Sequence, residues 1–140
     1  MSGINLKVTT DSYSGSDLSW LKHQKGFDTA RSITLDLSTF LAAHYANGKI
    51  PSGTVLGKIT ASGKYGPYDN AAGDGRTTAA GFLLFDVRVQ DAQGNALADP
   101  GCALLWEGIV DETKLPAFAG TTLGEIDANG KTDLKFVVFE

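Results

Sequence analysis

Apolar and polar residues alternate over several short stretches after residue 31, a pattern that predicts β-strands. Residues 33–37 place Ile33, Leu35 and Leu37 on one face, with polar residues between them. Similar stretches predict strands at residues 54–60, 103–110 and 134–139. Each stretch is short and is bounded by Gly, Pro, Asn or Asp, which favour turns. The pattern therefore predicts a small, mostly-β domain.

Residues 78–89 form the strongest predicted strand, and they carry apolar side chains on both faces. Phe82 and Leu84 share one face, while Leu83 and Phe85 share the other. A strand of this kind is covered on both sides. The cover is expected to come from a second layer of the same chain or from a neighbouring subunit.

The segments between the predicted strands carry turn and cap signals. Ser38 is expected to cap a short helix over residues 39–46. Residues 91–95 and 127–130 contain Asp, Asn and Gly in combinations that predict hairpin turns. Residues 61–77 are expected to form a long Gly-rich loop, and loops of this length are often functional.

The first 31 residues are mainly polar, with scattered apolar positions and one short alternation at Ile4, Leu6 and Val8. This alternation predicts an extended piece, and the rest has no sustained period. A frayed terminus is one interpretation. The other is an arm, residues 1–31, that becomes ordered against a partner of the β-rich domain, residues 32–140. Removing residues 1–30 is then expected to leave a folded protein that no longer attaches to its partner. The expected partner contacts are Leu18, Trp20, Leu21, Phe27 and Arg31.

The charge of the chain argues against two classes of partner. Its formal net charge is −4 and its pI is about 5.1, without a run of basic residues. Nucleic acids and anionic membranes are bound through dense Lys and Arg, so neither is an expected partner. No apolar run reaches the roughly 18 residues of a membrane span. The first ten residues do not resemble a signal peptide, so synthesis in the cytoplasm without export is expected.

No set of residues predicts catalysis or metal binding. The single cysteine, Cys102, lies in an apolar stretch and is expected to be a small buried residue. His23 and His44 lack further ligands at zinc-binding spacing. Residues 69–75 do not match a calcium loop, and Asp and Gly here are expected to form turns. The chain is therefore expected to be non-enzymatic, with no cofactor and no metal.

Several segments, taken in order, resemble the lambda-type head decoration proteins of tailed phages. No one motif is specific, but the order and spacing of the segments are shared over roughly residues 20–140. The N-terminal part resembles longer members that have an extension. The segments are RSITLD at residues 31–36, IPSGTVLG at 50–57, GKYGPYD at 63–69, DGRTTAAGFLL at 74–84, ALLWEG at 103–108 and AFAGT at 117–121.

The resemblance implies a β-clip-like fold or partly open β-barrel with an extended N-terminal arm and one or two short helices. It also implies a homotrimer at three-fold and quasi-three-fold sites of the mature capsid, where it resists internal DNA pressure. The implied partners are the major capsid protein and the chain itself, on the outer surface of the virion. Contacts within the trimer are expected at Tyr65, Pro67, Tyr68, Arg76 and Trp106.

Two other functions remain open at this point. A carbohydrate-binding or adhesion module would use aromatic residues such as Trp20, Tyr65, Tyr68 and Trp106 as stacking platforms. A trimeric dUTPase-like nucleotide hydrolase shares the β-clip theme, but its basic Gly-rich tail is not matched by the apolar, acid-terminated residues 135–140.

Overall fold

The computed structural model describes residues 16–23, 26–45, 48–91 and 93–140. The predicted extended piece at Ile4, Leu6 and Val8 lies outside these residues. Among the described residues, the 3-10 helices are η1 (Leu37–Thr39), η2 (Ala42–Tyr45) and η3 (Glu112–Lys114), and the α-helix is α1 (Ala128–Asp133). The strands are β1 (Arg31–Thr34), β2 (Lys49–Ile50), β3 (Val55–Lys58), β4 (Tyr65–Pro67), β5 (Ala79–Leu83), β6 (Val87–Arg88), β7 (Gly101–Leu105), β8 (Gly108–Val110) and β9 (Val137–Phe139).

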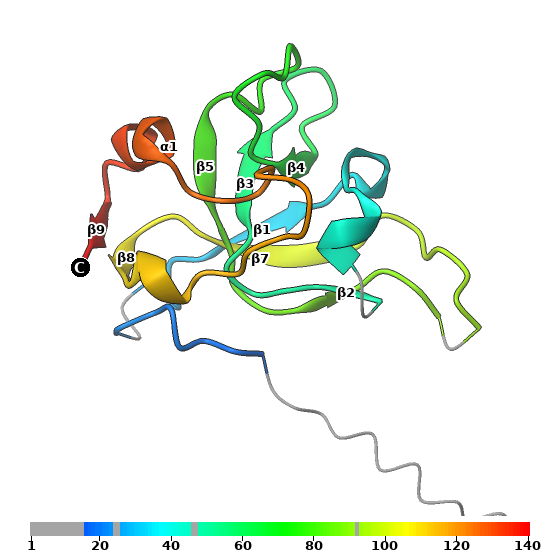
Figure 1. Cartoon of the computed structure of the whole chain (residues 1–140), viewed down its shortest axis with the longest axis horizontal. Helices are drawn as coiled ribbons and strands as arrows, with labels where there is room; N and C mark the ends of the chain where they lie inside the picture. The colour runs from blue at the N-terminus through cyan, green and yellow to red at the C-terminus, as the bar shows by residue number, and fades with distance from the viewer. Residues whose placement is uncertain (1–15, 24–25, 46–47, 92) are drawn as a thin grey trace, which may run out of the picture.

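Most of these strands belong to one antiparallel sheet with the order β1-β7-β5-β3-β4. Strands β2 and β6 form an antiparallel pair, while β8 and β9 pair in parallel. In Figure 1, β3, β4 and β5 stand together, β1 and β7 run across them, and α1 leads into β9 at the side. The prediction of a mostly-β fold with a short helix is confirmed.

The two edge strands of the five-stranded sheet curl toward each other. Leu35, just after β1, forms a single parallel bridge with Tyr65 at the start of β4. Next to it, the Asp36 N–H donates to the Tyr65 carbonyl oxygen at 2.8 Å. The sheet is therefore an open, curled sheet whose edges meet at one point.

The core has two clusters because neighbouring residues of each central strand point to opposite faces. Phe82 belongs to the first cluster and Leu83 to the second, and both are 0% exposed. Leu105 and Leu104 of β7 divide in the same way. The chain itself thus covers both faces of β5. The two-sided apolar pattern gives no argument for a subunit interface.

The predicted strand over residues 78–89 is interrupted after Leu83. β5 and β6 are separated by residues 84–86, where the Ser52 N–H donates to the Asp86 carboxylate at 2.7 Å. Phe85 leaves the core at this break, and its side chain is 45% exposed. The predicted strand over residues 103–110 is likewise divided into β7 and β8. In both places the chain turns and pairs with a different strand, so an apolar run that is continuous in the sequence is divided between two strands.

The helix predicted over residues 39–46 is wrong, because two separate 3-10 helices occupy the region. Asp36, not Ser38, caps η1: its carboxylate accepts the Ser38 N–H at 3.1 Å. Phe40 then adopts an extended conformation (φ −91°, ψ 140°). Its side chain enters the second core cluster and is only 5% exposed. The burial of Phe40 therefore stops the helix after one turn.

The two predicted hairpin turns have opposite outcomes. At residues 91–95 the prediction is confirmed, since the Asp91 N–H donates to the Asn95 carbonyl at 2.9 Å. At residues 127–130 it is wrong, because the helix α1 begins there. The Asp127 carboxylate accepts the Gly130 N–H at 2.8 Å and so caps this helix. In the described part of the chain, no helix has the length and apolar character needed to cross a bilayer.

Candidate partner-binding surface

Residues 16–23 and 26–30, which we call the N-terminal segment, include a short stretch that pairs with β8. Leu21 forms an antiparallel bridge with Val110. Beside it, the Lys22 N–H donates to the Ile109 carbonyl oxygen at 3.0 Å. Because β9 pairs with β8 as well, β8 has neighbours from both ends of the described chain.

Trp20 fixes this segment to the core. Its side chain is 1% exposed, and its ring centroid lies 5.3 Å from that of Phe82. The indole Nε1–H donates to Ser52 Oγ at 3.0 Å, and the Ser52 hydroxyl donates in turn to the Leu84 carbonyl at 2.7 Å. Trp20 was expected to contact a partner, but its side chain lies within the first core cluster of the chain itself. In this structure it is a core residue and offers no surface to a partner.

The other predicted contacts of the arm remain partly exposed. Of these, Leu18, Leu21 and Phe27 line a shallow groove, which we call the apolar groove, close to the start of the described chain. The Phe27 ring also meets the Phe85 ring edge to face at 6.0 Å. The apolar pattern predicts Phe85 inside a buried strand, so it does not reveal Phe85 as a surface residue. The groove is lined by Leu18, Leu21, Lys22, His23 and Phe27.

A second aromatic surface surrounds Trp106. The Arg31 guanidinium lies 4.9 Å from the Trp106 ring centroid, and the indole N–H donates to the Thr29 carbonyl at 2.7 Å. Phe136 meets Trp106 edge to face at 5.6 Å and is 68% exposed, and Val138 is 53% exposed. We call Trp106, Phe136 and Val138 the aromatic ledge. Alternation over residues 134–139 predicts a strand, but it cannot show which face stays uncovered.

Three of the residues predicted to contact another subunit are instead buried within the chain. Tyr65 and Tyr68 are 9% and 2% exposed and fill the second and first core clusters, and Pro67 is also buried. Trp20, Tyr65 and Tyr68 therefore provide no aromatic platform for a sugar. Arg76 is paired with Asp74 at 3.0 Å.

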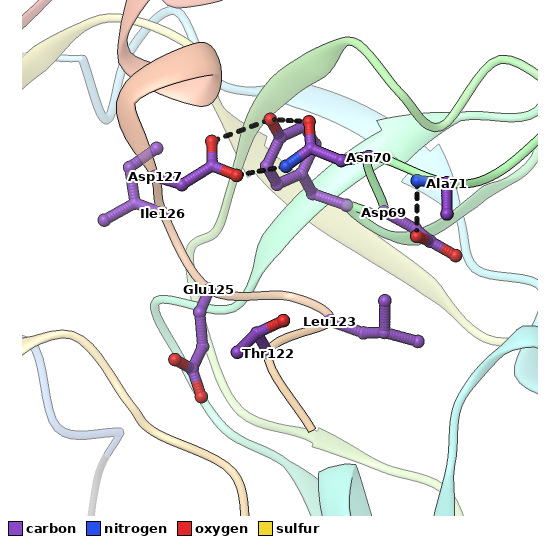
Figure 2. A pocket seen from close by; sticks show the side chains of 9 residues that line it. Asp69, Asn70, Ala71, Thr122, Leu123, Glu125, Ile126 and Asp127 are labelled. Carbon is purple, nitrogen blue, oxygen red and sulfur yellow. Dashed lines mark hydrogen bonds between the residues drawn. The ribbon is translucent and has the colours of Figure 1, made fainter.

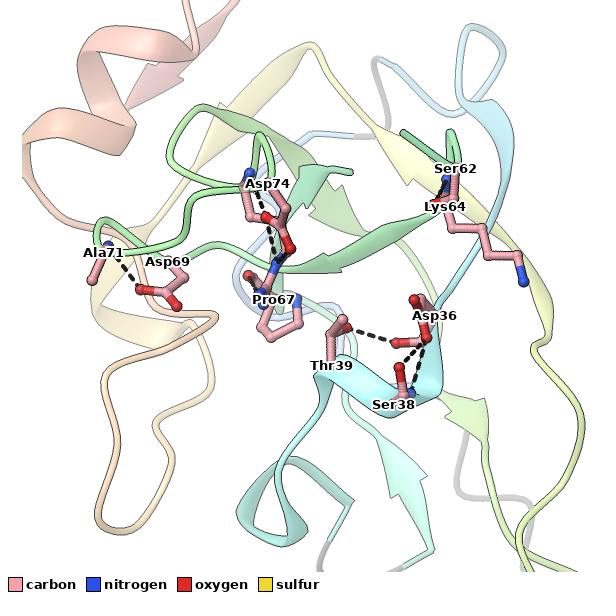
Figure 3. Close-up of polar contacts among 10 residues, drawn as sticks. Asp36, Ser38, Thr39, Ser62, Lys64, Pro67, Asp69, Ala71 and Asp74 are labelled. Carbon is pink, nitrogen blue, oxygen red and sulfur yellow. Dashed lines mark hydrogen bonds and ion pairs between the residues drawn. The ribbon is translucent and has the colours of Figure 1, made fainter. Parts of the chain in front are cut away.

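The acidic residues of the long loop have structural roles. Asp69 accepts the Ala71 N–H at 2.9 Å, and Asp74 accepts the Arg76 N–H at 3.2 Å, as expected for turns built by Asp (Figure 3). The Arg76 guanidinium also reaches the Pro67 carbonyl at 3.5 Å. Burial alone would raise the pKa of Asp74, but the hydrogen bonds and the positive charge of Arg76 outweigh this effect, so the pKa of Asp74 is lowered.

A polar pocket lies between the loop at residues 68–71 and the segment at residues 122–127 (Figure 2). The Tyr68 hydroxyl is 2.7 Å from Asn70 Oδ1 and 2.8 Å from Asp127 Oδ1, and Asn70 also donates to Asp127. Burial is the largest cause that raises the pKa of Tyr68, and the hydrogen bond to Asp127 and the charge of Asp127 raise it further. Burial disfavours the charged form of Asp127, but hydrogen bonds from Gly130, Tyr68 and Asn70 lower its pKa overall. Tyr68, Asn70 and Asp127 thus bond one another at the side of this pocket.

His44 and Cys102 are also committed to the fold. The Leu41 N–H donates to His44 Nδ1 at 2.9 Å, and His44 Nε2 lies 2.8 Å from the Leu123 carbonyl. Burial raises the pKa of the Cys102 thiol to about 12, so it is protonated and unreactive at neutral pH. Within the ranges that the structure describes, no three His, Cys, Asp or Glu residues are grouped to hold a metal ion.

Comparison with known families gives one match. The sequence profile described as Bacteriophage lambda head decoration protein D matches residues 27–135, which is most of the chain. Searches of curated proteins and of solved structures returned no match. Proteins of this family are structural components of the phage head and are not enzymes, and membership implies capsid binding on the virion surface. The chain belongs to the bacteriophage lambda head decoration protein D family.

Proposed function

We propose that this chain decorates the mature phage capsid as a homotrimer and holds the major capsid protein through its N-terminal part. The family match over residues 27–135 carries the proposal, because family membership implies decoration and stabilisation of the capsid. Trimers at three-fold and quasi-three-fold sites would act as staples between neighbouring capsomers. Such staples resist the outward pressure of the packaged DNA.

The apolar groove supports the N-terminal part as the attachment site. Leu18, Leu21 and Phe27 keep part of their apolar surface exposed, and Phe85 extends that surface. Covering this apolar surface with a partner would contribute roughly 25 cal/mol per Å² to the free energy of binding. The alternation within residues 1–15 favours an extended segment that adds to a sheet edge of the capsid protein. Main-chain hydrogen bonds would then supply affinity, and the groove would fix the register.

The aromatic ledge supports contact between copies of the chain. Aromatic residues and Arg are enriched in protein interfaces, and Trp106, Phe136 and Arg31 lie together here. Of the five residues first expected at the trimer contact, Trp106 is the one that belongs to this surface. The subunit contact is therefore proposed at the aromatic ledge, and not at the buried Tyr65 and Tyr68.

Trimerisation would strengthen attachment without new contacts. Three N-terminal segments on one rigid trimer bind multivalently, so modest single contacts add up to tight attachment. A protein that binds the expanded lattice and not its precursor stabilises the expanded lattice by mass action.

Co-sedimentation with expanded capsids tests the attachment site. Leu18→Glu and Phe27→Glu each place a charge in the apolar groove and are expected to reduce the bound amount at least tenfold. Leu97→Glu is the matched control, because Leu97 is an exposed apolar residue (39%) on the loop after β6. Circular dichroism checks that each variant folds. Wild-type binding by folded groove variants contradicts the groove as the attachment site.

Analytical ultracentrifugation tests the subunit contact. The wild-type chain is expected to sediment as a trimer, and Phe136→Asp is expected to shift it toward monomer. Leu97→Asp should leave the trimer intact. A wild-type chain that is monomeric in solution and arranged around two-fold axes on particles contradicts the proposed trimer.

A further inference from the structure

The edges of the five-stranded sheet enclose a groove that shares only Arg31 with the surfaces described so far. β1 and β4 meet at the Leu35–Tyr65 bridge and diverge from that point. The space between them, which we call the notch, is lined by Arg31–Thr34, by Lys58 at the end of β3 and by residues 62–65. The notch therefore has one strand edge on each side.

The β1 side of the notch presents unused main-chain groups. The Leu35 N–H donates to the Pro100 carbonyl at 3.0 Å, on the side of β7. Main-chain groups alternate in direction along a strand, so Ser32 and Thr34 point their N–H and C=O groups the opposite way, into the notch. The Asp36 N–H follows the same alternation and donates to Tyr65. An unpaired edge of this kind is a template for an added strand.

The side chains around the notch are basic. Arg31, Lys58 and Lys64 line it, and none of its lining residues is acidic. Lys64 is already paired with Asp99 at 2.8 Å, so Arg31 and Lys58 carry the uncompensated charge. In Figure 3, Lys64 extends from the hairpin that joins β3 to β4. This basic edge contrasts with the formal net charge of −4 for the whole chain.

We infer that an extended, acidic segment of the major capsid protein docks in the notch as an added strand along β1. This inference rests on the proposed function and names a second contact with the same partner. The four residues of β1 span about 13 Å at roughly 3.3 Å per residue, so a segment of about four to six residues fits. Its main chain pairs with Ser32 and Thr34, and its carboxylates approach Arg31 and Lys58.

Other occupants fit the notch less well. Residues 1–15 of the chain carry one Lys and one Asp, Lys7 and Asp11, and so provide no net negative charge. A nucleic acid requires a denser basic surface than three cations, one of which is paired. Neither alternative uses both the free strand edge and the positive charge.

Capsid binding by three variants at low and high salt tests this inference. Lys58→Glu is expected to weaken binding about fivefold or more at low salt and to reduce the salt dependence. Ser32→Pro removes an N–H that faces the notch and is tolerated on an edge strand, so a similar loss is expected. Lys135→Glu makes the same charge change outside the notch and should alter binding less than about twofold. Wild-type binding by both notch variants overturns the inference.

A peptide titration keeps the test independent of the capsid. The ¹⁵N-labelled chain is mixed with the peptide Thr-Glu-Val-Glu-Thr-Glu, with its Lys-for-Glu counterpart, or with a short DNA duplex. The acidic peptide alone is expected to shift the Ser32 and Thr34 amide signals. Equal shifts with DNA show a general polyanion site and overturn the inference. Failure of the wild-type chain to bind capsids refutes the proposed function, whereas unshifted amides refute the notch.

Discussion

Replacing Trp20 by Ala tests the role that the structure gives to the N-terminal segment. The side chain is 1% exposed, packs on Phe82 and donates to Ser52. Truncating a buried Trp to Ala costs about 3–5 kcal/mol. Ser52 keeps its bond to Leu84, so no buried hydroxyl is left without a partner. The expected loss is a large part of the roughly 5–15 kcal/mol that stabilises a typical domain.

Thermal and urea unfolding followed by far-ultraviolet circular dichroism measure this loss. For a chain of 140 residues, 1 kcal/mol corresponds to about 3 °C in Tm, so Trp20→Ala is expected to lower Tm by about 9–15 °C. Trp20→Phe retains most of the ring and should lose about 1–2 kcal/mol. Phe136→Ala, at a position 68% exposed, should change stability by less than about 0.5 kcal/mol.

The result that refutes this reasoning is a Trp20→Ala variant that melts within about 2 °C of wild type but no longer binds capsids. Trp20 would then be a partner anchor, as the sequence pattern first indicated. The packing also changes the expectation for deletion of residues 1–30. That deletion removes the Trp20 side chain, so it should destabilise the domain by at least as much as Trp20→Ala.

Three further outcomes are expected. Gly81→Ala places a Cβ 2.4 Å from a carbonyl oxygen of β7, so it should lower the free energy of unfolding in urea by about 1–3 kcal/mol. Gly73→Ala has open space around it and should lower this free energy by less than about 1 kcal/mol. Equal losses in the two variants contradict the close approach at Gly81. Asp127→Ala should cost about 1 kcal/mol at neutral pH, because it removes the cap on Gly130. The pKa of Asp127 is lowered in the folded state, so this difference should be present above pH 4 and shrink as the pH falls further; a constant difference contradicts the assignment. The pKa of Cys102 is raised to about 12 in the folded protein, so the thiol should be alkylated slowly at pH 8 in the folded protein and rapidly in urea. The same shift predicts that the free energy of unfolding declines as the pH rises from about 9. Equal alkylation rates with and without urea contradict this.

The sequence predicted the class of fold because its signals are local. Alternation at residues 33–37 and 54–60 overlaps β1 (Arg31–Thr34) and β3 (Val55–Lys58), although β1 ends before Leu37, which begins η1. Asp and Gly at residues 91–95 mark a turn. Residues 127–130 show where local signals are ambiguous, since Asp begins both turns and helices. The choice there is made by contacts distant in sequence: Tyr68 bonds Asp127 and helps to hold the start of α1.

The candidate surface was harder to predict because burial depends on residues distant in sequence. The apolar residues of the N-terminal segment look equivalent in the sequence, yet Trp20 enters the core while Leu18 and Phe27 stay partly exposed. Ser52, far along the chain, provides the hydrogen bond that makes burial of the indole favourable. Phe136 is left exposed because β9 pairs with β8 and not with the large sheet.

The position of β8 between Leu21 and β9 also constrains how the protein can be synthesised. The segments that flank β8 leave the ribosome at the start and near the finish of translation of the described chain. The core cluster around Trp20 includes Val110 of β8 and Val137 of β9, so it is complete only once both strands have left the ribosome. Premature termination before β8 would release a product in which this cluster is incomplete, and such a product would be prone to aggregate rather than to reach a capsid.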